Sequence, residues 1–329
     1  MKALRLRSAG NIELVDEPSP QPETGEALVR VLSVGICGSD LHWFMQGNIG
    51  DAVLHQPLVL GHEFGGVVEG GPLDGRRVAV DPAVPCGACA RCREGNENLC
   101  PTVRFAGHSG TDGGLREYIA WPTKLLHPVP DGFDDSTIAL LEPLGVALHA
   151  LDLGHVRFGA PVGVVGCGPI GLMLVQLAHA GGGSSVIAVE RLVHRRHAAT
   201  ALGCEVAVGP GDVGSCENTV DVVFEVAGND EAIVAAMTIV RPGGRVVLAG
   251  IPDDDMTRFP ASLARRKGLT IAIVRRMKDA YPRAIRLVER KVVDLEPLAS
   301  HTWPLEDAAE AFTSAARREG IKTVIAVSA

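Results

Sequence analysis

Apolar residues in the first third of the chain form short runs that turn residues separate. Valine-rich runs cover residues 27–34, 64–68 and 77–80, and glycine, proline or aspartate bounds each of them. Such runs predict β-strands. Further on, the pattern changes, and apolar residues at helical spacing predict a helix over residues 136–154. We therefore expect a β-rich N-terminal part that ends in a long helix.

From residue 160 onward, strand and helix patterns alternate. The predicted strands are, in chain order, PVGVV, SVIAVE, EVAVG, VDVVFEV, GGRVVLAGI and GLTIAIV. Helices are predicted over residues 170–180, 194–202 and 230–240, whereas the segment PGDVGSCENT has room for one or two helical turns only. Alternation of this kind predicts βαβ units and a parallel sheet with helices on both faces, which is an α/β fold.

The C-terminal tail has a mixed pattern, with helices predicted over residues 281–290 and 305–318 and a last strand over 322–327. The segment GLTIAIV is apolar throughout and is the last of the six strands. An exposed apolar edge strand is a liability for a folded protein. We therefore expect this strand to pair with its copy in a homodimer or a homotetramer.

Composition indicates a globular protein of about two domains, because domains commonly hold roughly 100–200 residues and this chain has 329. Hydrophobic residues make up 46% and the formal net charge is −8, so a large core is expected and a nucleic-acid partner is not. The sequence lacks a signal-like apolar run near its start, and no apolar stretch approaches the roughly 18–20 residues that span a bilayer. We expect a cytoplasmic protein without a membrane partner.

Four of the eight cysteines, Cys86, Cys89, Cys92 and Cys100, lie within fifteen residues. Three explanations compete: a disulfide framework, a zinc knuckle that binds nucleic acid, and a zinc site that stabilises a lobe of a larger protein. Disulfides rarely persist in a reducing cytoplasm, which disfavours the first explanation. The choice between the other two depends on the rest of the chain.

A glycine-rich loop, GCGPIG, runs from Gly166 through Gly168, Pro169 and Ile170 to Gly171. This GxGxxG pattern follows a predicted strand and opens a predicted helix, which is the context in which it indicates dinucleotide binding. The first glycine makes a tight turn, the second lets the backbone approach a pyrophosphate, and the third lets the helix pack on the strand. The N–H groups of the helix N-terminus then face the phosphates.

The next predicted strand ends in Glu190, nineteen residues after Gly171. An acidic residue there binds the ribose hydroxyls of the adenosine and repels a 2′-phosphate, so it favours NAD. Arg191 and Arg195 lie close by in the sequence and keep NADP as the less favoured alternative.

A second metal site is indicated by Cys37 and His62, each of which lies in a glycine-bracketed segment. Glu63 follows directly, and Glu142 lies in the otherwise apolar segment LLEPL, where a carboxylate is costly to bury without a partner. Catalytic zinc sites have three protein ligands and one open position. Cys37 and His62 meet this requirement together with either Glu63 or Glu142, and the residues alone do not decide between the two.

Several long motifs together resemble the zinc-dependent medium-chain dehydrogenase/reductase superfamily, and within it the polyol branch of sorbitol, xylitol and L-idonate dehydrogenases. The motifs are GICGSDLH, VLGHEFGGVVEGG, RVAVDPAVPCGACARCREGNENLC, DGGLREYI, LLEPLGVALHAL, GCGPIG and RPGGRVVLAGI, and the resemblance continues through the C-terminal tail. It implies a GroES-like β-rich catalytic domain with a structural zinc lobe, joined to a Rossmann doubly wound parallel sheet.

The resemblance also implies a domain division and two zinc ions per chain. The catalytic domain is expected over residues 1–147 with 279–329 returning to it, and the NAD-binding domain over 148–278. The four clustered cysteines are then expected to hold the structural zinc, because four thiolates close a tetrahedral site and leave no position for a substrate. Zinc and NAD are the expected cofactors.

The activity that the resemblance implies is reversible oxidation of a secondary alcohol, a small molecule, to a ketone, with hydride transfer to nicotinamide. Ser39 resembles the first proton acceptor of the family and His42 its relay to solvent, while Asp40 resembles a residue that orients a zinc ligand. The resemblance also makes Glu63 a candidate catalytic residue. Arg276 is a candidate contact of the cofactor or the substrate.

The sequence departs from the polyol branch at two places in the expected pocket wall. Trp43 and Phe44 stand where tyrosines are common, and Met277 stands where a tyrosine is expected. We therefore hypothesise a pocket that is more apolar than in its relatives and favours shorter or deoxygenated polyols. The alternatives are an L-threonine 3-dehydrogenase, an amino-cyclitol dehydrogenase and, more remotely, a crystallin-like relative without activity.

Overall fold

The computed structural model describes residues 1–108 and 110–328. By their internal contacts these residues form two compact units. The first unit comprises Met1–Pro143, Tyr281–Glu289 and Leu295–Ala329, and the second comprises Leu144–Ala280 and Arg290–Asp294. The C-terminal tail therefore belongs mainly to the first unit, and a short part of it belongs to the second because Asp294 exchanges two hydrogen bonds with the side chain of Gln176.

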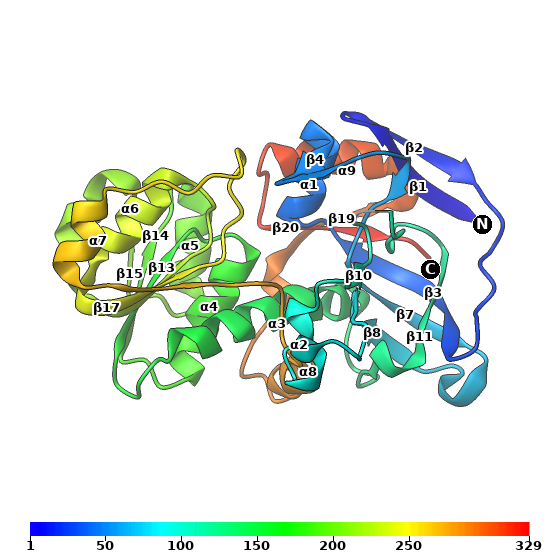
Figure 1. The fold of residues 1–329 in the computed structure, drawn as a ribbon, viewed down its shortest axis with the longest axis horizontal. Coiled ribbons are helices and arrows are strands. Elements are labelled where there is room, and N and C mark those ends of the chain that lie inside the picture. Colours follow the sequence, from blue (N-terminus) through cyan, green and yellow to red (C-terminus); the bar gives the residue numbers. More distant parts are fainter. Residues whose placement is uncertain (109, 329) are drawn as a thin grey trace. The chain divides into compact units, whose positions relative to one another are not determined.

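A seven-stranded sheet forms the centre of the first unit (Figure 1). Its strands are β3 (Glu26–Gly35), β7 (Glu63–Glu69), β8 (Arg77–Val80), β11 (Tyr118–Pro122), β12 (Leu126–Pro128), β19 (Ala299–Pro304) and β20 (Lys322–Ala326). The order is β12-β8-β7-β3-β20-β19, and β11 also pairs with β3. The last strand of the chain thus lies beside β3, with Val324 opposite Gly35.

Smaller elements surround this sheet. The remaining strands of the first unit are β1 (Lys2–Ser8), β2 (Asn11–Asp16), β4 (Asn48–Ile49), β5 (Ala52–Val53), β6 (Leu58–Val59), β9 (Ala83–Val84) and β10 (Arg104–Phe105). Its helices are α1 (Gly38–Gln46), α2 (Ala90–Arg93), α8 (Tyr281–Glu289) and α9 (Ala308–Ala316). Short 3-10 helices in the connections of the whole chain span Gly71–Leu73, Glu97–Leu99, Thr123–Leu125, Pro210–Cys216, Glu296–Leu298 and Leu305–Asp307.

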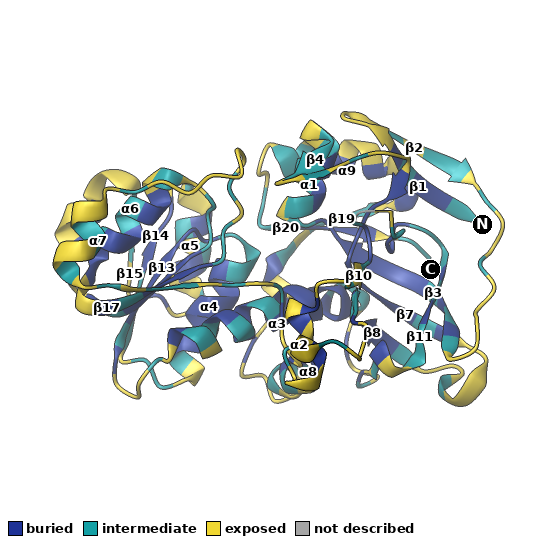
Figure 2. Ribbon diagram, in the orientation of Figure 1, coloured by how far each residue is buried: buried dark blue, intermediate teal, exposed yellow. Residues whose placement is uncertain are grey.

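The second unit is a six-stranded parallel sheet with helices, as the alternating pattern predicts. The strands are β13 (Pro161–Val165), β14 (Ser185–Val189), β15 (Val206–Val208), β16 (Val220–Glu225), β17 (Val240–Leu248) and β18 (Thr270–Ile273). The helices are α4 (Pro169–Ala180), α5 (Val193–Ala201), α6 (Asp230–Ile239) and α7 (Ala261–Lys267). Most residues of β13 and β14 are buried (Figure 2), which fits the apolar character of these segments.

The strand order of this sheet is β15-β14-β13-β16-β17-β18, so the chain order reverses between β13 and β16. Right-handed crossovers on either side of the reversal place α4 and α5 on one face and α6 and α7 on the other. A reversal of this kind opens a crevice at the carboxyl ends of the two strands, where doubly wound sheets bind ligands. The short crossover predicted between the third and fourth strands is the 3-10 helix Pro210–Cys216.

Helix α3 (Asp135–Gly154) corrects one expectation from the sequence. Its 20 residues are long and apolar enough to cross a membrane, although no apolar stretch of that kind was expected. Most of its apolar window is buried inside the protein, which is typical of the core helix of a soluble protein. The misjudgement arose because Glu142 and Pro143 interrupt the apolar run in the sequence but not the helix.

Glycines at positions 65 and 66 allow the strands and α3 to approach each other closely. A Cβ atom on Gly65 would lie 2.2 Å from the side chain of Ile138 in α3, and one on Gly66 would lie 2.2 Å from the backbone oxygen of Arg30 in β3. The contact with Ile138 could relax through a side chain, although a Cβ on Gly65 would also lie 2.6 Å from the backbone oxygen of Val78. The contact of Gly66 involves the backbone of a paired strand. Gly66 is therefore a position where only glycine fits.

We predict that Gly66→Ala lowers the free energy of unfolding by about 1–3 kcal/mol, because a methyl group forced into a packed interior shifts its neighbours. Gly132→Ala is the matched control in the same unit, since a Cβ at Gly132 has no heavy atom within 4 Å. Urea denaturation of both variants and the wild type measures the effect. An equal midpoint for the two variants would contradict the prediction.

Candidate active site and metal centres

Cys37, His62 and Glu63 lie together in the first unit, and their donor atoms all lie within 4.8 Å of one another. The paired strands β3 and β7 bring them there, because Gly35 at the end of β3 lies opposite Glu63 at the start of β7. Cys37 follows β3 by two residues and His62 directly precedes β7. The two glycine-bracketed segments that the sequence singled out therefore meet at one point.

Asp40 holds this cluster in place from behind. Its carboxylate accepts the backbone N–H of Cys37 at 2.9 Å and that of Gly61 at 3.2 Å, and it lies 3.4 Å from Nδ1 of His62. Burial raises the pKa of Asp40, but His62 and the two N–H donors lower it by more than burial raises it. The pKa of Asp40 is therefore below its ordinary value. A carboxylate on one ring nitrogen fixes the imidazole and leaves Nε2 for a metal, as in many metal sites.

Glu63 also forms an ion pair with Lys322 of β20. Both side chains are buried, with 1% of Glu63 and 4% of Lys322 exposed, so water screens neither charge. Gly35 makes room for the pair, since a Cβ there would lie 2.3 Å from Oε2 of Glu63. Burial lowers the pKa of Lys322, but Glu63 and its neighbours raise it above the ordinary value, so the lysine stays charged. The sequence analysis missed Lys322, although a lysine at the start of the apolar strand KTVIA was a usable signal.

Glu142, the other acidic candidate, lies in α3 and is also buried. Burial raises its pKa to about 8, and the charge of Glu63 raises it while that of His62 lowers it. Among the described residues Glu142 does not belong to the group whose donor atoms meet, whereas Glu63 does. The geometry therefore favours Glu63 over Glu142 as the carboxylate nearest to a metal held by Cys37 and His62.

The chemistry of this donor set fits a divalent cation. Burial lowers the pKa of His62, but Asp40 and Cys37 raise it well above the ordinary value. Without a metal, the negative groups around His62 thus hold a proton on it. A thiolate, an imidazole and a carboxylate are ligands that zinc prefers, and three ligands leave a fourth position open.

Ser39 and His42, the predicted proton-transfer residues, both lie on α1. The hydroxyl of Ser39 is 3.4 Å from Nε2 of His62, so it lies at the metal-facing side of the cluster. His42 is half-buried one helical turn further along. Their roles stay predictions.

The four clustered cysteines also converge. Cys86, Cys89, Cys92 and Cys100 have sulfur atoms within 4.8 Å of one another. The Sγ of Cys92 lies 3.5 Å from that of Cys89 and 3.9 Å from that of Cys86. Four sulfurs around one zinc at about 2.3 Å lie roughly 3.8 Å apart, so the spacing fits a tetrahedral zinc site. None of the four forms a disulfide, which removes the first of the three explanations.

Local backbone geometry prepares these thiols for a metal. N–H groups of Ala88 and Cys89 point at the sulfur of Cys86 and lower its pKa to about 6. Burial and the neighbouring thiols raise the pKa of Cys92 to about 12. The thiol of Cys86 therefore ionises readily, whereas the thiol of Cys92 needs a bound cation in order to ionise. This behaviour is expected of a thiolate site without its metal.

In the second unit the glycine loop connects β13 to α4 and has the backbone that the pattern predicts. Gly166 has a φ of 96°, and a Cβ there would lie 3.0 Å from Ala227. A Cβ on Gly171 would lie 1.9 Å from the backbone oxygen of Gly166, so helix and loop touch through bare backbone. Gly168 is the N-cap of α4, and Pro169 and Ile170 lie in its first turn. The backbone N–H groups at this N-terminus can therefore face an anion.

Glu190 and Arg195 both lie beside this loop. The carboxylate of Glu190 accepts the backbone N–H of Cys167 at 2.7 Å and that of Leu192 at 2.8 Å. A Cβ on Gly168 would lie 3.6 Å from a guanidinium nitrogen of Arg195. Arg276 lies apart in sequence and has a left-handed backbone with a φ of 55°. The structure thus brings Glu190 and Arg195 to the loop, and the role of Arg276 stays a prediction.

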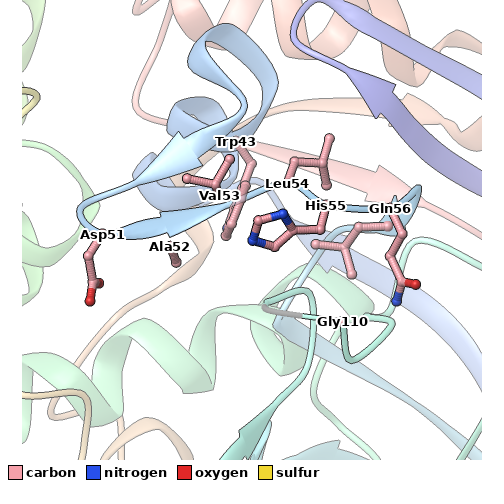
Figure 3. Close-up of a pocket in the computed structure, with 9 residues that line it drawn as sticks. Trp43, Asp51, Ala52, Val53, Leu54, His55, Gln56 and Gly110 are labelled. Carbon is pink, nitrogen blue, oxygen red and sulfur yellow. The ribbon is translucent and has the colours of Figure 1, made fainter.

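A pocket of ≈ 290 Å³ lies in the first unit (Figure 3). Its lining residues are Trp43, Asp51, Ala52, Val53, Leu54, His55, Gln56, Leu58 and Gly110. Figure 3 shows that most of them come from the β4–β5 hairpin and the segment after it, with Gly110 on the facing loop. The sequence analysis missed this hairpin, because its two-residue strands carry no recognisable pattern.

Ring contacts lead from this pocket to the metal cluster. Trp43 contacts His108 edge to face at 5.4 Å, His108 contacts Phe105 at 6.5 Å, and Phe105 contacts His62 at 5.3 Å between ring centroids. Phe105 and His108 were also missed by the sequence analysis, since single aromatic residues in a loop give no signal before the fold is known.

The residues proposed for an apolar pocket wall have different positions. Trp43 is buried and lines the pocket of Figure 3. Phe44 instead contacts Phe312 of α9 at 5.2 Å. Met277 belongs to the second unit, where its sulfur would lie 2.4 Å from a Cβ on Gly145. Phe44 and Met277 therefore do not line this pocket.

Comparison with known proteins decides the family. The family of alcohol dehydrogenase GroES-like domains matches residues 23–131, and the family of zinc-binding dehydrogenases matches residues 169–290. The chain is 32% identical to sorbitol dehydrogenase of Bacillus subtilis, over 96% of this chain and 93% of that protein. It belongs to the polyol branch of the zinc-dependent medium-chain dehydrogenases.

Two further relatives of this medium-chain dehydrogenase cover nearly the whole chain. Sorbitol dehydrogenase of Gallus gallus is 34% identical over 98% of this chain and 95% of that protein. The crystal structure of L-idonate 5-dehydrogenase from Escherichia coli superimposes with a TM-score of 0.90 at 27% identity, over 99% of this chain and 98% of that one. The resemblance and the fold class predicted from the sequence are confirmed.

The buried ion pair of this dehydrogenase generates a prediction. Lys322→Met leaves Glu63 buried without its partner, which we expect to cost about 3–5 kcal/mol of stability in the metal-free protein. Zinc should restore more stability in the variant than in the wild type, because the freed carboxylate gains a metal partner. Thermal unfolding after chelator dialysis, and again with zinc, measures both effects.

Lys2→Met is the control, because it removes an exposed ion pair with Glu306. Such surface pairs contribute little to stability, so its melting temperature should stay close to that of the wild type in both conditions. Equal melting temperatures for Lys322→Met and Lys2→Met would show that the buried pair does not stabilise the site.

Proposed function

We propose that this medium-chain dehydrogenase oxidises a secondary alcohol of a polyol or sugar acid to a ketone, with NAD as the hydride acceptor. The observation that carries the proposal is the convergence of Cys37, His62 and Glu63 in one cluster of donor atoms, with an imidazole that Asp40 orients. The sorbitol dehydrogenases and the L-idonate dehydrogenase among its relatives support the substrate class.

Cys37, His62 and Glu63 would hold a catalytic zinc, and the four clustered cysteines a structural one. When bound, the catalytic zinc supplies a Lewis acid that lowers the pKa of an alcohol, and NAD supplies the acceptor for the hydride. Glu63 has two competing partners in this arrangement, the metal and Lys322. Glu142 would remain close by as a buried carboxyl rather than as a third ligand.

The proton that leaves the alcohol needs a path to solvent. Ser39 is the first acceptor in our proposal, because its hydroxyl lies beside Nε2 of His62, the nitrogen that faces the metal position. His42 on the same helix would pass the proton outward. The balance of the reaction is one hydride from the carbinol carbon to the nicotinamide and one proton from the hydroxyl to water, which leaves a ketone.

The cofactor would bind in the second unit, at the carboxyl ends of β13 and β14. Gly166, Gly168 and Gly171 would receive the pyrophosphate, and Glu190 the ribose hydroxyls of the adenosine. Glu190 supports NAD over NADP because its carboxylate is buried beside the loop, where a 2′-phosphate would be repelled. Arg195 beside Gly168 is the feature that would favour NADP.

The pocket of Figure 3 would recognise the part of the substrate away from the reacting carbon. It combines the apolar Trp43 with three polar side chains, Asp51, His55 and Gln56. These three side chains are exposed at the pocket and can hydrogen-bond hydroxyl groups of a ligand. This supports a substrate with several hydroxyl groups.

We further propose a cytoplasmic homo-oligomer that forms through the edge strand β18. This strand ends the parallel sheet, and its Ile273 is 75% exposed. A second copy of the strand would cover this side chain and pair the free backbone groups of the edge.

The first prediction from this function is two zinc ions per chain. Cys89→Ser should lose one zinc and much of the stability, because structural zinc contributes folding free energy directly. Cys37→Ser should also lose one zinc, yet keep most of the stability and lose turnover. Elemental analysis, thermal unfolding and activity assays separate the two sites, and one zinc or fewer in the wild type would refute the assignment.

The second prediction concerns substrate and cofactor. With NAD, kcat/KM for sorbitol, xylitol or L-idonate should exceed that for L-threonine at least tenfold, and 2,3-butanediol tests the preference for deoxygenated substrates. The sorbitol dehydrogenases and the L-idonate dehydrogenase among the relatives support this order of substrates. L-threonine as the best substrate would overturn the substrate class, and higher activity with NADP would overturn the role of Glu190.

A further inference from the structure

A buried carboxylate lies at the carboxyl end of β16, outside the sites described above. Glu225 is 1% exposed, and its Oε1 accepts the backbone N–H of Ala227 at 2.8 Å and that of Gly228 at 2.7 Å. The backbone N–H groups of Ala249 and Gly250, in the loop after β17, donate to the main-chain oxygen of Glu225 at 2.8 Å and 3.1 Å, and a Cβ on Gly250 would lie 2.9 Å from Oε2 of the carboxylate. Burial raises the pKa of Glu225, and the N–H groups of Ala227, Gly228 and Gly250 oppose that effect. Glu225 thus joins two loops, because its carboxylate accepts from the first and its main-chain oxygen accepts from the second.

The two loops pack on each other through bare backbone. Gly228 has a φ of 76°, and a Cβ there would lie 2.4 Å from the backbone oxygen of Ile251. A Cβ on Gly250 would lie 2.2 Å from the backbone nitrogen of Gly228. The glycine loop joins the same assembly, because Gly166 lies against Ala227. Loops after β13, β16 and β17 therefore form one surface, and Glu225 holds the part after β16 and β17.

The strand order indicates which half of a dinucleotide this surface meets. A doubly wound sheet binds a dinucleotide across the point where the strand order reverses, one mononucleotide on each half. Glu190 at the end of β14 lies on the adenosine side of the glycine loop. The other nucleotide must then extend over the ends of β16 and β17, which are the strands that Glu225 connects.

We propose that Glu225 is a positioning residue for the nicotinamide half of the cofactor. Its carboxylate orders the backbone of residues 226–228 and lies against Gly250 in the next loop, so that the two loops receive the nicotinamide mononucleotide. It acts through these loops without contacting the cofactor. This inference rests on the proposed cofactor site. It assigns separate residues to the two ends of the cofactor, with Glu190 at the adenosine and Glu225 at the nicotinamide.

The two ends can be tested separately, because AMP contains the adenosine end only. In Glu225→Gln the amide oxygen can still accept from Ala227 and Gly228, but the amide nitrogen replaces an acceptor with a donor near Gly250. We expect the Kd for NADH to rise roughly 10-fold, as for the loss of one buried hydrogen bond to a charged group. The Kd for AMP should stay within about twofold of the wild type, because the adenosine side is unchanged.

Isothermal titration calorimetry with NADH and with AMP measures both constants. Glu225→Asp is the second variant; it keeps the charge but withdraws it by one methylene, and it should show the same selective loss. Glu190→Gln is the reciprocal control, which should weaken both ligands. Melting temperature and zinc content of each variant show whether the fold is retained.

Three results would overturn the inference. An equal loss for NADH and AMP in the Glu225 variants would show a general loosening of the sheet. Unchanged affinity for both ligands in folded variants would show that the carboxylate only stabilises the loops. A wild-type protein that binds neither ligand would overturn the proposed cofactor site, and the inference with it, and is recognised before any variant is made.

Discussion

The negative charge of Glu63 has to be balanced inside the protein, and much of the first unit is arranged around that need. A buried carboxylate is costly unless a cation pairs with it. Lys322 supplies one cation from the last strand of the chain, and the cluster with Cys37 and His62 offers a second position for one. The sheet has to place β20 beside β3 for this pairing, which explains why the tail of the chain returns to the first unit.

The same site shows how carboxylates with different partners take different roles. Asp40 is held ionised by two backbone N–H groups and an imidazole, so it orients a ligand. Glu63 shares its charge with Lys322 and lies among the metal donors. Among the described residues Glu142 lies outside the group of metal donors, and burial raises its pKa to about 8.

Glycine has a corresponding role in the second unit, where backbone contacts replace side-chain contacts. Gly166, Gly171, Gly228 and Gly250 lie so close to neighbouring backbone that a methyl group would collide with it. Loops packed in this way present N–H groups instead of side chains to a ligand, which suits phosphates and ribose hydroxyls. The carboxylates of Glu190 and Glu225 then fix two of these loops by accepting their N–H groups.

What the sequence determined by itself is local in the chain. The spacing of Cys86, Cys89, Cys92 and Cys100 and the GCGPIG loop are short segments, and the alternation of strands and helices consists of βαβ units that follow one another along the chain. The α/β class with a parallel sheet followed from this alternation, whereas the GroES-like domain was implied by the family resemblance. The local structure of these segments depends on residues that are close in the sequence, so the sequence pattern is sufficient to predict it.

Only the tertiary structure decided which distant segments meet. It selected Glu63 over Glu142 as the carboxylate beside Cys37 and His62, and it placed Lys322 against that carboxylate. It also separated two neighbouring residues, because Phe44 contacts Phe312 whereas Trp43 lines a pocket. These contacts depend on strand order and on which strands pair. Hydrophobic periodicity indicates which segments are strands, but a strand can show the same pattern whichever strand lies beside it.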